Sequence, residues 1–329
     1  MQNYIVTAVE KGRVVLRETA VQEPGPKELQ VKVHTSLISP GTERASILAM
    51  ENTGCTFPID MGYSTVGTVV KTGGEVTGFK EGDRVACFCL HHCNIGNVHE
   101  NFCMKVDPEI PDKYAVFLAL GVICLQGIRK SRIELGESVM VLGLGPVGQL
   151  ALQLAKANGG LPVIGVDRFE SRMKTAMDTG ADAVLNSGQE DWQLQLRNIT
   201  GGEGPHVVIE STGFPEPVNM ALQAVRKFGR VVLLGSTRGE TTVNFYATIH
   251  RKALTVLGAH IMGNPAFESR PAFWTWKDDA CAFLQFVKHG RLNLEPLITE
   301  KVNWRESENI YKRLLQGDPG MMIPIIEWQ

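Results

Sequence analysis

Short apolar runs alternate with amphipathic segments through the middle of the chain, and this alternation limits the possible folds more than any other feature. The runs are continuously apolar, which is typical of strands buried on both faces of a parallel sheet. Six runs lie within residues 138–143, 162–167, 183–186, 206–212, 229–236 and 254–260. Segments with helical periodicity, such as residues 146–159, lie among them. The pattern predicts an α/β fold with a doubly wound parallel sheet.

The first third of the chain has a different pattern. Strand-like runs separated by Gly and Pro turns lie within residues 1–18, 29–39 and 64–89, and they predict a small β-barrel. Residues 114–131 have the pattern of a buried helix. Two further helices and a final strand are expected at residues 278–290, 307–317 and 321–328. A chain of 329 residues suits two domains.

Bulk composition argues against several functional classes. The chain has 33 Lys and Arg against 35 Asp and Glu, so no positive field attracts nucleic acid or an anionic membrane. The N-terminus lacks the apolar stretch of a signal peptide, and no window approaches the roughly 18 apolar residues of a membrane span. We expect a cytoplasmic protein with neither nucleic acid nor membrane as a partner. Its seven cysteines are then free thiols or metal ligands.

A glycine-rich motif stands where the first apolar run gives way to a helix. It reads Gly143–Leu144–Gly145–Pro146–Val147–Gly148, a G-x-G-x-x-G pattern. Gly143 allows a tight turn, Gly145 lets the backbone approach a pyrophosphate, and Gly148 lets helix and strand pack closely. The helix N-terminus offers N–H groups and a partial positive charge to phosphates. The motif in this setting predicts a dinucleotide site.

Asp167 ends the next apolar run, 24 residues after Gly143. Its carboxylate would accept hydrogen bonds from the ribose hydroxyls and repel a 2′-phosphate, which favours NAD over NADP. Arg168 is the opposing signal, because a guanidinium there can stack on adenine or meet that phosphate. Further cofactor contacts are expected at the carboxyl ends of later strands. The candidates are Ser211, Thr212, Gly235, Ser236 and Thr237, with Ala259 and His260 beside the nicotinamide.

The order of a β-rich segment, a doubly wound sheet and a short return resembles the medium-chain dehydrogenase/reductase superfamily over essentially the whole chain. Residues 39–44 (SPGTER) and 250–260 (HRKALTVLGAH) resemble zinc-type alcohol dehydrogenase-like proteins of the bacteriochlorophyllide dehydrogenase, sugar and cyclitol types. The resemblance implies a GroES-like barrel of residues 1–115 and 262–329 and a Rossmann domain of residues 116–261. It also implies a homodimer formed through the sheet edge.

The zinc ligands that this resemblance implies are missing. Their positions fall on Pro40, Tyr63 and Val122, with Cys124 one or two residues from the last. Proline and valine carry no donor, and tyrosine is a poor zinc ligand. We therefore expect no catalytic zinc, no structural zinc lobe, and Cys124 in the core. Seven potential ligands lie close together at Cys87, Cys89, His91, His92, Cys93, His99 and Cys103. Their spacing favours free thiols, and a relocated zinc site is the alternative.

Without zinc, side chains must handle the proton of the substrate hydroxyl. By the resemblance, residues 36–44 are a rebuilt active-site loop in which Thr42 matches a proton-relaying hydroxyl. Tyr63 replaces a metal ligand, and its phenol can donate to a substrate oxygen or simply fill the vacated space. His99 has an imidazole suited to proton exchange at neutral pH, or it is a hydrogen-bonded loop residue. Glu43 is a candidate base, or it pairs with Arg44 or another cation.

These residues predict an oxidoreductase that moves a hydride between NAD(H) and a secondary alcohol or ketone. The resemblance favours a polyhydroxylated, sugar- or cyclitol-like small molecule as the substrate. A zinc-independent NADPH ene or quinone reductase is the alternative enzyme, and Asp167 weighs against it. A nucleotide-binding protein without catalysis is the alternative from another functional class.

Overall fold

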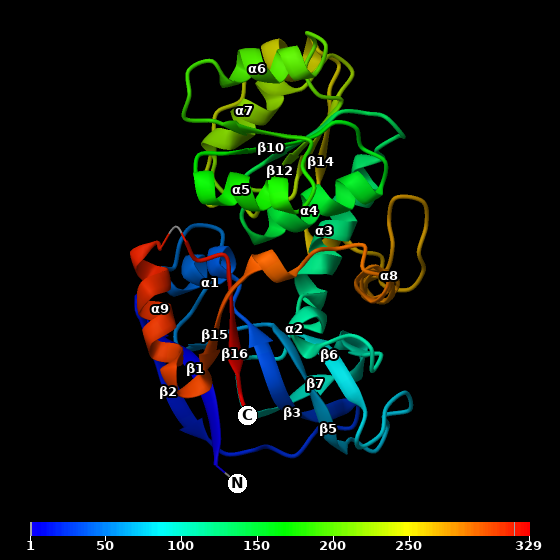
Figure 1. The fold of residues 1–329 in the computed structure, drawn as a ribbon. Coiled ribbons are helices and arrows are strands. Elements are labelled where there is room, and N and C mark those ends of the chain that lie inside the picture. Colours follow the sequence, from blue (N-terminus) through cyan, green and yellow to red (C-terminus); the bar gives the residue numbers. More distant parts are fainter. Residues whose placement is uncertain (1, 319) are drawn as a thin grey trace. The chain divides into compact units, whose positions relative to one another are not determined.

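The computed structural model describes residues 2–318 and 320–329, which form two compact units (Figure 1). The first unit comprises Met1–Ala119, Ala280–Gly290 and Ile298–Gln329. The second comprises Leu120–Asp279 and Arg291–Leu297. The second unit extends beyond residue 261, the predicted end of the Rossmann domain, because the residues that follow its last strand still contact it. Among these residues, the backbone oxygen of His260 accepts a hydrogen bond from Gln126.

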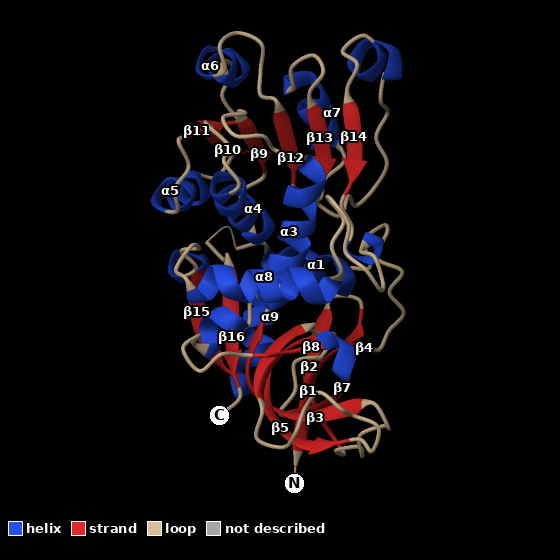
Figure 2. Ribbon diagram, turned by 90° about the vertical axis from the view of Figure 1, so that its right-hand side faces the viewer, coloured by secondary structure: helices blue, strands red, loops and turns tan. Residues whose placement is uncertain are grey.

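The first unit contains two sheets, whose strands appear curved in Figure 2. The smaller, antiparallel sheet has the order β2–β1–β4, with bounds Arg13–Thr19, Asn3–Glu10 and Ile59–Asp60. The larger has the order β15–β16–β3–β5–β6–β8, and β7 also pairs with β3. These strands are β3 (Glu28–Leu37), β5 (Ser64–Thr72), β6 (Arg84–Phe88), β7 (Ile95–His99), β8 (Cys103–Lys105), β15 (Ile298–Asn303) and β16 (Ile323–Glu327). The expected GroES-like barrel is confirmed.

The strand β3 shows why this unit folds as a barrel. Its residues Leu29, Val31 and Val33 are buried, while Lys32 between them is exposed. This alternation directs one face into the core and the other outward. Helix α9 (Ser307–Gln316) packs on β2, where Glu308 accepts a hydrogen bond from the backbone N–H of Leu16 at 3.0 Å.

Other helices lie between these strands in the sequence. They are α1 (Pro40–Ile47), α2 (Asp112–Ala115), α3 (Leu118–Ser131) and α8 (Trp276–Lys288). Single turns are η1 (Glu100–Phe102), η2 (Tyr246–His250), η3 (Ile261–Gly263), η4 (Glu295–Leu297) and η5 (Trp304–Glu306). Helix α1 occupies most of the stretch that we expected to be a loop. Pro40 takes its first position, where a missing backbone N–H costs nothing and a fixed φ suits the helix.

Each of the six apolar runs forms one strand of a parallel sheet in the second unit. The order is β11–β10–β9–β12–β13–β14. The strands are β9 (Val139–Leu142), β10 (Val163–Asp167), β11 (Ala183–Asn186), β12 (Val207–Glu210), β13 (Arg230–Leu233) and β14 (Thr255–Gly258). Figure 1 shows α4 (Pro146–Ala157) and α5 (Glu170–Asp178) on one face and α6 (Trp192–Ile199) and α7 (Glu216–Ala224) on the other. The predicted doubly wound Rossmann sheet is confirmed.

The sheet order reverses between β9 and β12, which places a topological switch point at their carboxyl ends. Under the sheet, Met140, Ile164 and Val208 form one apolar cluster with Trp192 of α6. This cluster fixes the strands so that the loops after them meet at one edge.

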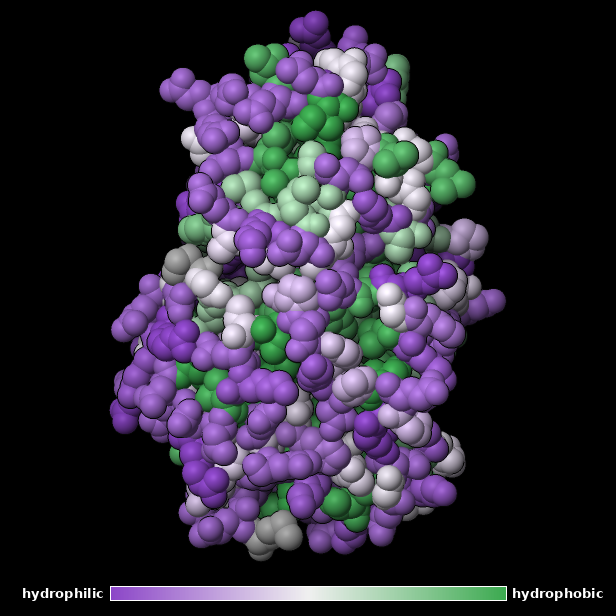
Figure 3. All heavy atoms as spheres, in the orientation of Figure 1, coloured by the Kyte–Doolittle hydropathy of each residue, from purple (hydrophilic) through white to green (hydrophobic). Residues whose placement is uncertain are grey.

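The surface carries hydrophilic residues over most of the face drawn in Figure 3, with hydrophobic residues in scattered groups between them. Isolated apolar side chains of this kind are normal on soluble domains. Within the described part of the chain, no helix has the length and apolar character needed to cross a membrane.

The strand β14 stands at one edge of the parallel sheet (Figure 2). It pairs with β13 on one side only, and three of its four residues are exposed. Open strand edges present unpaired N–H and C=O groups to a further strand. We propose that a second copy of the chain pairs along this edge.

Val256, exposed to 38%, provides the test of this pairing. A Val256→Lys variant should sediment as a monomer where the native chain sediments as a dimer, because a lysine charge on the edge opposes strand pairing. Leu135→Lys is the matched control, since Leu135 is 90% exposed in the same unit but lies outside the sheet. A monomeric native chain, or a dimer that survives Val256→Lys, would contradict the pairing.

Candidate functional site

The glycine loop after β9 has the geometry of a dinucleotide cradle. Gly143 has φ of +89°, and a Cβ there would lie 2.7 Å from Cγ2 of Thr212. A Cβ on Gly148 would lie 1.8 Å from the carbonyl oxygen of Gly143. Packing therefore requires glycine at both positions. A Cβ on Gly145 would meet nothing within 4 Å, so this residue borders open space where a pyrophosphate can approach the backbone.

The ends of the central strands are joined at this loop. The Ser211 hydroxyl donates to the carbonyl oxygens of Leu142 at 3.0 Å and Gly143 at 2.7 Å. A Cβ on Gly235 would lie 2.7 Å from the backbone nitrogen of Gly213, so the loops after β12 and β13 are also in close contact. The structure thus brings Ser211, Thr212 and Gly235 together with the glycine motif.

The other expected cofactor residues lie in the same unit. Ser236 follows Gly235, and its carbonyl oxygen would be 3.3 Å from a Cβ on Gly213. Thr237 is half-buried. Ala259 donates its N–H to Leu233 at 3.0 Å and so continues directly from β14. The imidazole of His260 accepts the N–H of Met262 at 3.3 Å and begins the turn η3.

Asp167 is buried at the end of β10, and its carboxylate is fixed against the glycine loop. Oδ2 accepts the N–H of Leu144 at 2.7 Å. Oδ1 accepts the N–H groups of Arg168 at 2.7 Å and Phe169 at 3.0 Å. Since a carboxylate oxygen has two acceptor sites, Oδ2 retains capacity for a ribose hydroxyl.

Two arginines contact the ring of Phe169. The guanidinium carbons of Arg168 and Arg172 lie 5.0 Å and 4.8 Å from the ring centroid of Phe169. A guanidinium nitrogen of Arg172 also lies 3.7 Å from Oδ2 of Asp167. An acidic group and two arginines therefore occur together after β10, so the opposing signals for NAD and NADP remain.

Glu210 is a residue of this site that sequence reasoning missed. Its side chain is fully buried at the end of β12, and Oε1 accepts the N–H of Thr212 at 2.7 Å as well as its hydroxyl. Burial raises the pKa of Glu210, and the hydrogen bonds from Thr212 oppose that shift. An acidic residue inside an apolar run was the available signal. The carboxyl group holds Thr212 in place beside Gly143.

In the first unit, the start of α1 places Thr42 and Glu43 in different environments. Thr42 is exposed, whereas Glu43 is 2% exposed. Oε1 of Glu43 accepts the N–H of Ser39 at 2.7 Å, and Oε2 accepts the hydroxyl of Tyr311. His92 Nε2 lies 3.2 Å from Oε2. The side chain opposite the Glu43 carboxylate is thus His92, which the sequence analysis did not pair with it.

Tyr63 and His99 lie apart from each other. The strand β3 pairs with both neighbours, and its register sets Ser36 opposite Thr65 but Glu28 opposite His99. Tyr63, which immediately precedes β5, belongs to the same end of the sheet as α1. The structure therefore groups Tyr63 with Thr42. His99 ends a different strand, and its carbonyl oxygen lies 3.7 Å from the sulfur of Cys103 in β8.

A series of aromatic contacts connects Tyr63 to His99. Two phenylalanine rings stand between them, with Tyr63–Phe88 and Phe88–Phe102 centroids 5.9 Å apart and Phe102–His99 centroids 6.4 Å apart. His99 Nδ1 accepts the N–H of Asn101 at 3.1 Å and caps the turn η1. His99 thus has a local structural role.

The Cys/His segment of residues 87–103 does not converge. Cys87 and Cys103 face each other across β6 and β8 with sulfurs 3.7 Å apart in the core, while Cys89 is exposed. Burial raises the pKa of Cys93 to about 12, which disfavours the thiolate that metals bind. Across residues 2–318 and 320–329, no group of three or more His, Cys, Asp or Glu side chains is arranged to hold a metal ion.

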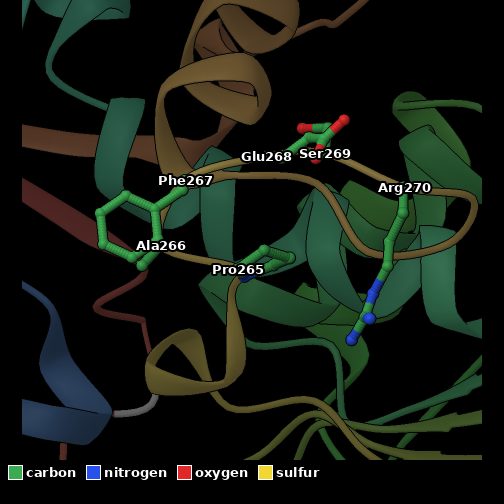
Figure 4. Close-up of a pocket in the computed structure, with 6 residues that line it drawn as sticks. All are labelled: Pro265, Ala266, Phe267, Glu268, Ser269 and Arg270. Atoms are coloured by element: carbon green, nitrogen blue, oxygen red, sulfur yellow. The ribbon is translucent and has the colours of Figure 1, made fainter.

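Cys124 lies in the core of the second unit, as its apolar helix predicts. It is fully buried, and its sulfur lies 3.3 Å from the carbonyl oxygen of Val147. Burial raises its pKa strongly. A separate hollow is lined by Pro265, Ala266, Phe267, Glu268, Ser269 and Arg270. Figure 4 shows that the side chains of Phe267, Glu268 and Arg270 point in different directions, so this hollow gathers no reactive groups.

Comparison with known proteins places these two units in one family. L-threonine 3-dehydrogenase of Pyrococcus horikoshii is 30% identical over 340 residues, covering 94% of each chain. The chain belongs to the zinc-type alcohol dehydrogenase-like proteins of the medium-chain dehydrogenase/reductase superfamily. The family described as alcohol dehydrogenase GroES-like domain matches residues 25–142, and that described as zinc-binding dehydrogenase matches residues 146–276. This alcohol dehydrogenase-like chain is therefore an oxidoreductase of that type.

Two further similarities define its context. Erythritol/L-threitol dehydrogenase of Mycolicibacterium smegmatis is 26% identical over 300 residues, covering 80% of this chain and 79% of that protein. A putative zinc-binding dehydrogenase of Sinorhizobium meliloti 1021, solved bound to NADP, shares the fold with a TM-score of 0.83. It is 22% identical, and the match covers 99% of each chain.

Gly145 allows the cradle to be tested without disturbing the fold. Gly145→Ala should leave the thermal midpoint unchanged, because a Cβ there meets no protein atom. It should raise the dissociation constant for a nicotinamide dinucleotide at least about tenfold, equivalent to about 1.4 kcal/mol, since the methyl group obstructs the pyrophosphate. Gly78→Ala, an equally open position in the first unit, is the control. Calorimetric titration measures the dissociation constants of both variants. Equal affinity of Gly145→Ala and Gly78→Ala for the dinucleotide would refute the cradle.

Proposed function

We propose that this protein is an NAD-dependent dehydrogenase of secondary alcohols, acting in either direction between alcohol and ketone, without catalytic zinc. The observation that carries the proposal is a complete dinucleotide cradle in a chain whose expected metal positions hold proline, tyrosine and valine and none of the usual zinc ligands. A relative named for threonine supports a secondary-alcohol substrate, and one named for erythritol or L-threitol supports a polyhydroxylated one. Sugar- and cyclitol-like secondary alcohols are the class we infer.

The residues at the expected metal positions do not fit a zinc ion. Pro40 begins helix α1 and has no donor in its side chain, and Val122 has none either. Cys124 is buried against the backbone of Val147. Zinc sites require three protein ligands of the His, Cys or carboxylate type. No step of the proposed reaction therefore uses a metal.

The residues of the second unit fit NAD. Gly145 leaves room for the pyrophosphate, and the N-terminus of α4 carries the partial positive charge that attracts it. Asp167 would hold the adenosine ribose through Oδ2. When bound, NAD supplies the carbon that accepts or returns a hydride. The charge on Asp167 disfavours a 2′-phosphate, while Arg168 favours it. We infer a preference for NAD because hydrogen bonds fix the Asp167 carboxylate against the glycine loop.

The first unit supplies the groups for the hydroxyl proton. Thr42 is exposed on the first turn of α1, and half-buried Tyr63 lies at the same end of the sheet. We infer that the Tyr63 phenol donates to, or accepts from, the substrate oxygen and that the Thr42 hydroxyl passes the proton onward. Positioned acid–base groups contribute about 10²- to 10⁴-fold to a rate. His99 is omitted from this pair because its ring caps the turn η1 and two phenylalanine rings lie between it and Tyr63.

Metal content and nucleotide preference test the proposal together. We expect elemental analysis to find near-zero zinc, titration to show tighter binding of NAD than NADP, and a panel of polyols and sugars to include a substrate. One zinc per chain would refute the metal-free reaction. A preference for NADPH with reduction of enones or quinones would favour the alternative reductase. NAD binding without turnover of any alcohol or ketone would favour a non-catalytic protein.

The role of Tyr63 has a matched internal control. Tyr63→Phe should lower kcat by about 10²- to 10⁴-fold, because it removes the phenol oxygen but keeps the ring beside Phe88. NAD affinity should not change, since the cradle belongs to the other unit. His99→Ala should leave kcat within about twofold of the native value, well inside the effect of one lost acid–base group. Steady-state kinetics decides, and the reverse ranking of the two variants would remove Tyr63 from the reaction.

A further inference from the structure

His92 supports the turn that carries Tyr63. The His92 ring lies directly under Gly62, whose φ is +85°, and a Cβ on Gly62 would lie 2.4–2.5 Å from three ring atoms. The backbone N–H of His92 donates to the carbonyl oxygen of Met61 at 2.8 Å. Any shift of this ring must therefore displace the residues that lead into Tyr63.

The same imidazole reaches the start of α1 through one carboxylate. His92 Nε2 lies 3.2 Å from Oε2 of Glu43, whose Oε1 accepts the N–H of Ser39 at 2.7 Å. The backbone N–H of Glu43 in turn donates to the carbonyl oxygen of Ser39 at 2.9 Å. Thr42 lies inside this closed turn. The Glu43–His92 pair thus contacts the two segments that present Thr42 and Tyr63.

The donors and acceptors around the pair have a consistent order. Trp328 Nε1 can only donate, and it donates to Ser36 Oγ at 2.8 Å. The Ser36 hydroxyl lies 2.8 Å from His92 Nδ1 and can donate to it, which leaves Nε2–H for the Glu43 carboxylate. Tyr311 donates to that carboxylate as well, and burial and the neighbouring Glu43 keep its pKa well above the usual range. Every side chain in this hydrogen-bonded series, from Trp328 to Tyr311, therefore has a partner.

Burial makes the pair resistant to rearrangement. The side chains of His92 and Glu43 are 0% and 2% exposed, so neither can exchange its partner for water. A buried polar group left without a hydrogen bond is costly, and a buried charge without a partner is more so. The first turn of α1 and the turn before Tyr63 are consequently held in one relative arrangement.

We propose that Glu43 and His92 are positioning residues that fix Thr42 and Tyr63 with respect to each other. The catalytic meaning of this role rests on the proposed function, whereas the mechanical coupling of the two turns does not. Neither residue touches the substrate, because both are enclosed in the core. Displacements of about 1 Å in reacting groups cost up to about 100-fold in rate, so a fixed arrangement has a measurable consequence.

Hydrogen exchange of the intact chain tests the coupling without any substrate. Glu43→Gln keeps the side-chain shape and removes the carboxylate, and His92→Gln removes the bridge between Ser36 and Glu43. Each should speed backbone exchange in both segments, residues 39–44 and 61–64, by at least about tenfold. Tyr311→Phe is the matched control, because it removes one donor to the same carboxylate from α9 without touching Gly62. It should leave residues 61–64 unchanged.

Ser36→Ala is a milder variant for the case in which the glutamine variants do not fold. It removes the partner of His92 Nδ1 and the acceptor of Trp328 Nε1 but keeps the Glu43–His92 contact, so it should speed exchange in both segments to a smaller extent. For any folded variant, a change confined to one segment overturns the coupling. A Tyr311→Phe variant that loosens residues 61–64 as much as His92→Gln overturns it also.

Kinetics tests the positioning role separately. Glu43→Gln and His92→Gln should lower kcat by about ten- to 100-fold, with KM and the NAD dissociation constant within about twofold of the native values. A merely structural role would lower the amount of folded enzyme and leave kcat per folded molecule unchanged. Native enzyme that turns over no alcohol refutes the proposed function, while the exchange data still decide the coupling.

Discussion

A carboxylate that cannot reach water organises the first unit. Glu43 is enclosed by donors from three parts of the chain: the backbone of Ser39, the imidazole of His92 and the hydroxyl of Tyr311. Removing a donor from a buried polar group typically costs about 1–3 kcal/mol, and more where the group is charged, since water cannot replace the lost hydrogen bond. Tyr311 is 268 residues beyond Glu43, so this single group ties helix α9 to the N-terminal barrel.

The parts of the fold that depend on local pattern could be predicted, because burial on both faces of a parallel strand leaves a continuous apolar run. All six strands of the second unit follow from that rule, and the glycine motif is recognised by its place after the first of them. Helix α1 was not predicted. A proline usually interrupts a helix, but Pro40 occupies the first helical position, where proline favours one. Glu210 was missed although its acidic side chain stands inside an apolar run, because that run was interpreted only as a strand.

The partners of Glu43 and His99 could not be derived from local sequence. His92 is 49 residues from Glu43, and nothing near either residue specifies the other. The place of His99 depends on the register of β3 with β7, which sets it opposite Glu28. Register is a property of two strands and their connections, so the neighbours of a histidine cannot be derived from its own segment alone. The grouping of Thr42 with Tyr63 comes from the same register.

Replacing a metal with hydroxyl groups changes what the scaffold must provide. A zinc ion orients its ligands and polarises an oxygen by its own charge. A phenol and a threonine hydroxyl act only through hydrogen bonds, whose strength falls steeply away from about 2.7–2.8 Å and a linear angle. A site without metal therefore requires tighter control of backbone position around Thr42 and Tyr63. In the metal-free reaction that we propose, the buried Glu43–His92 pair provides that control, because it contacts both turns and is shielded from water.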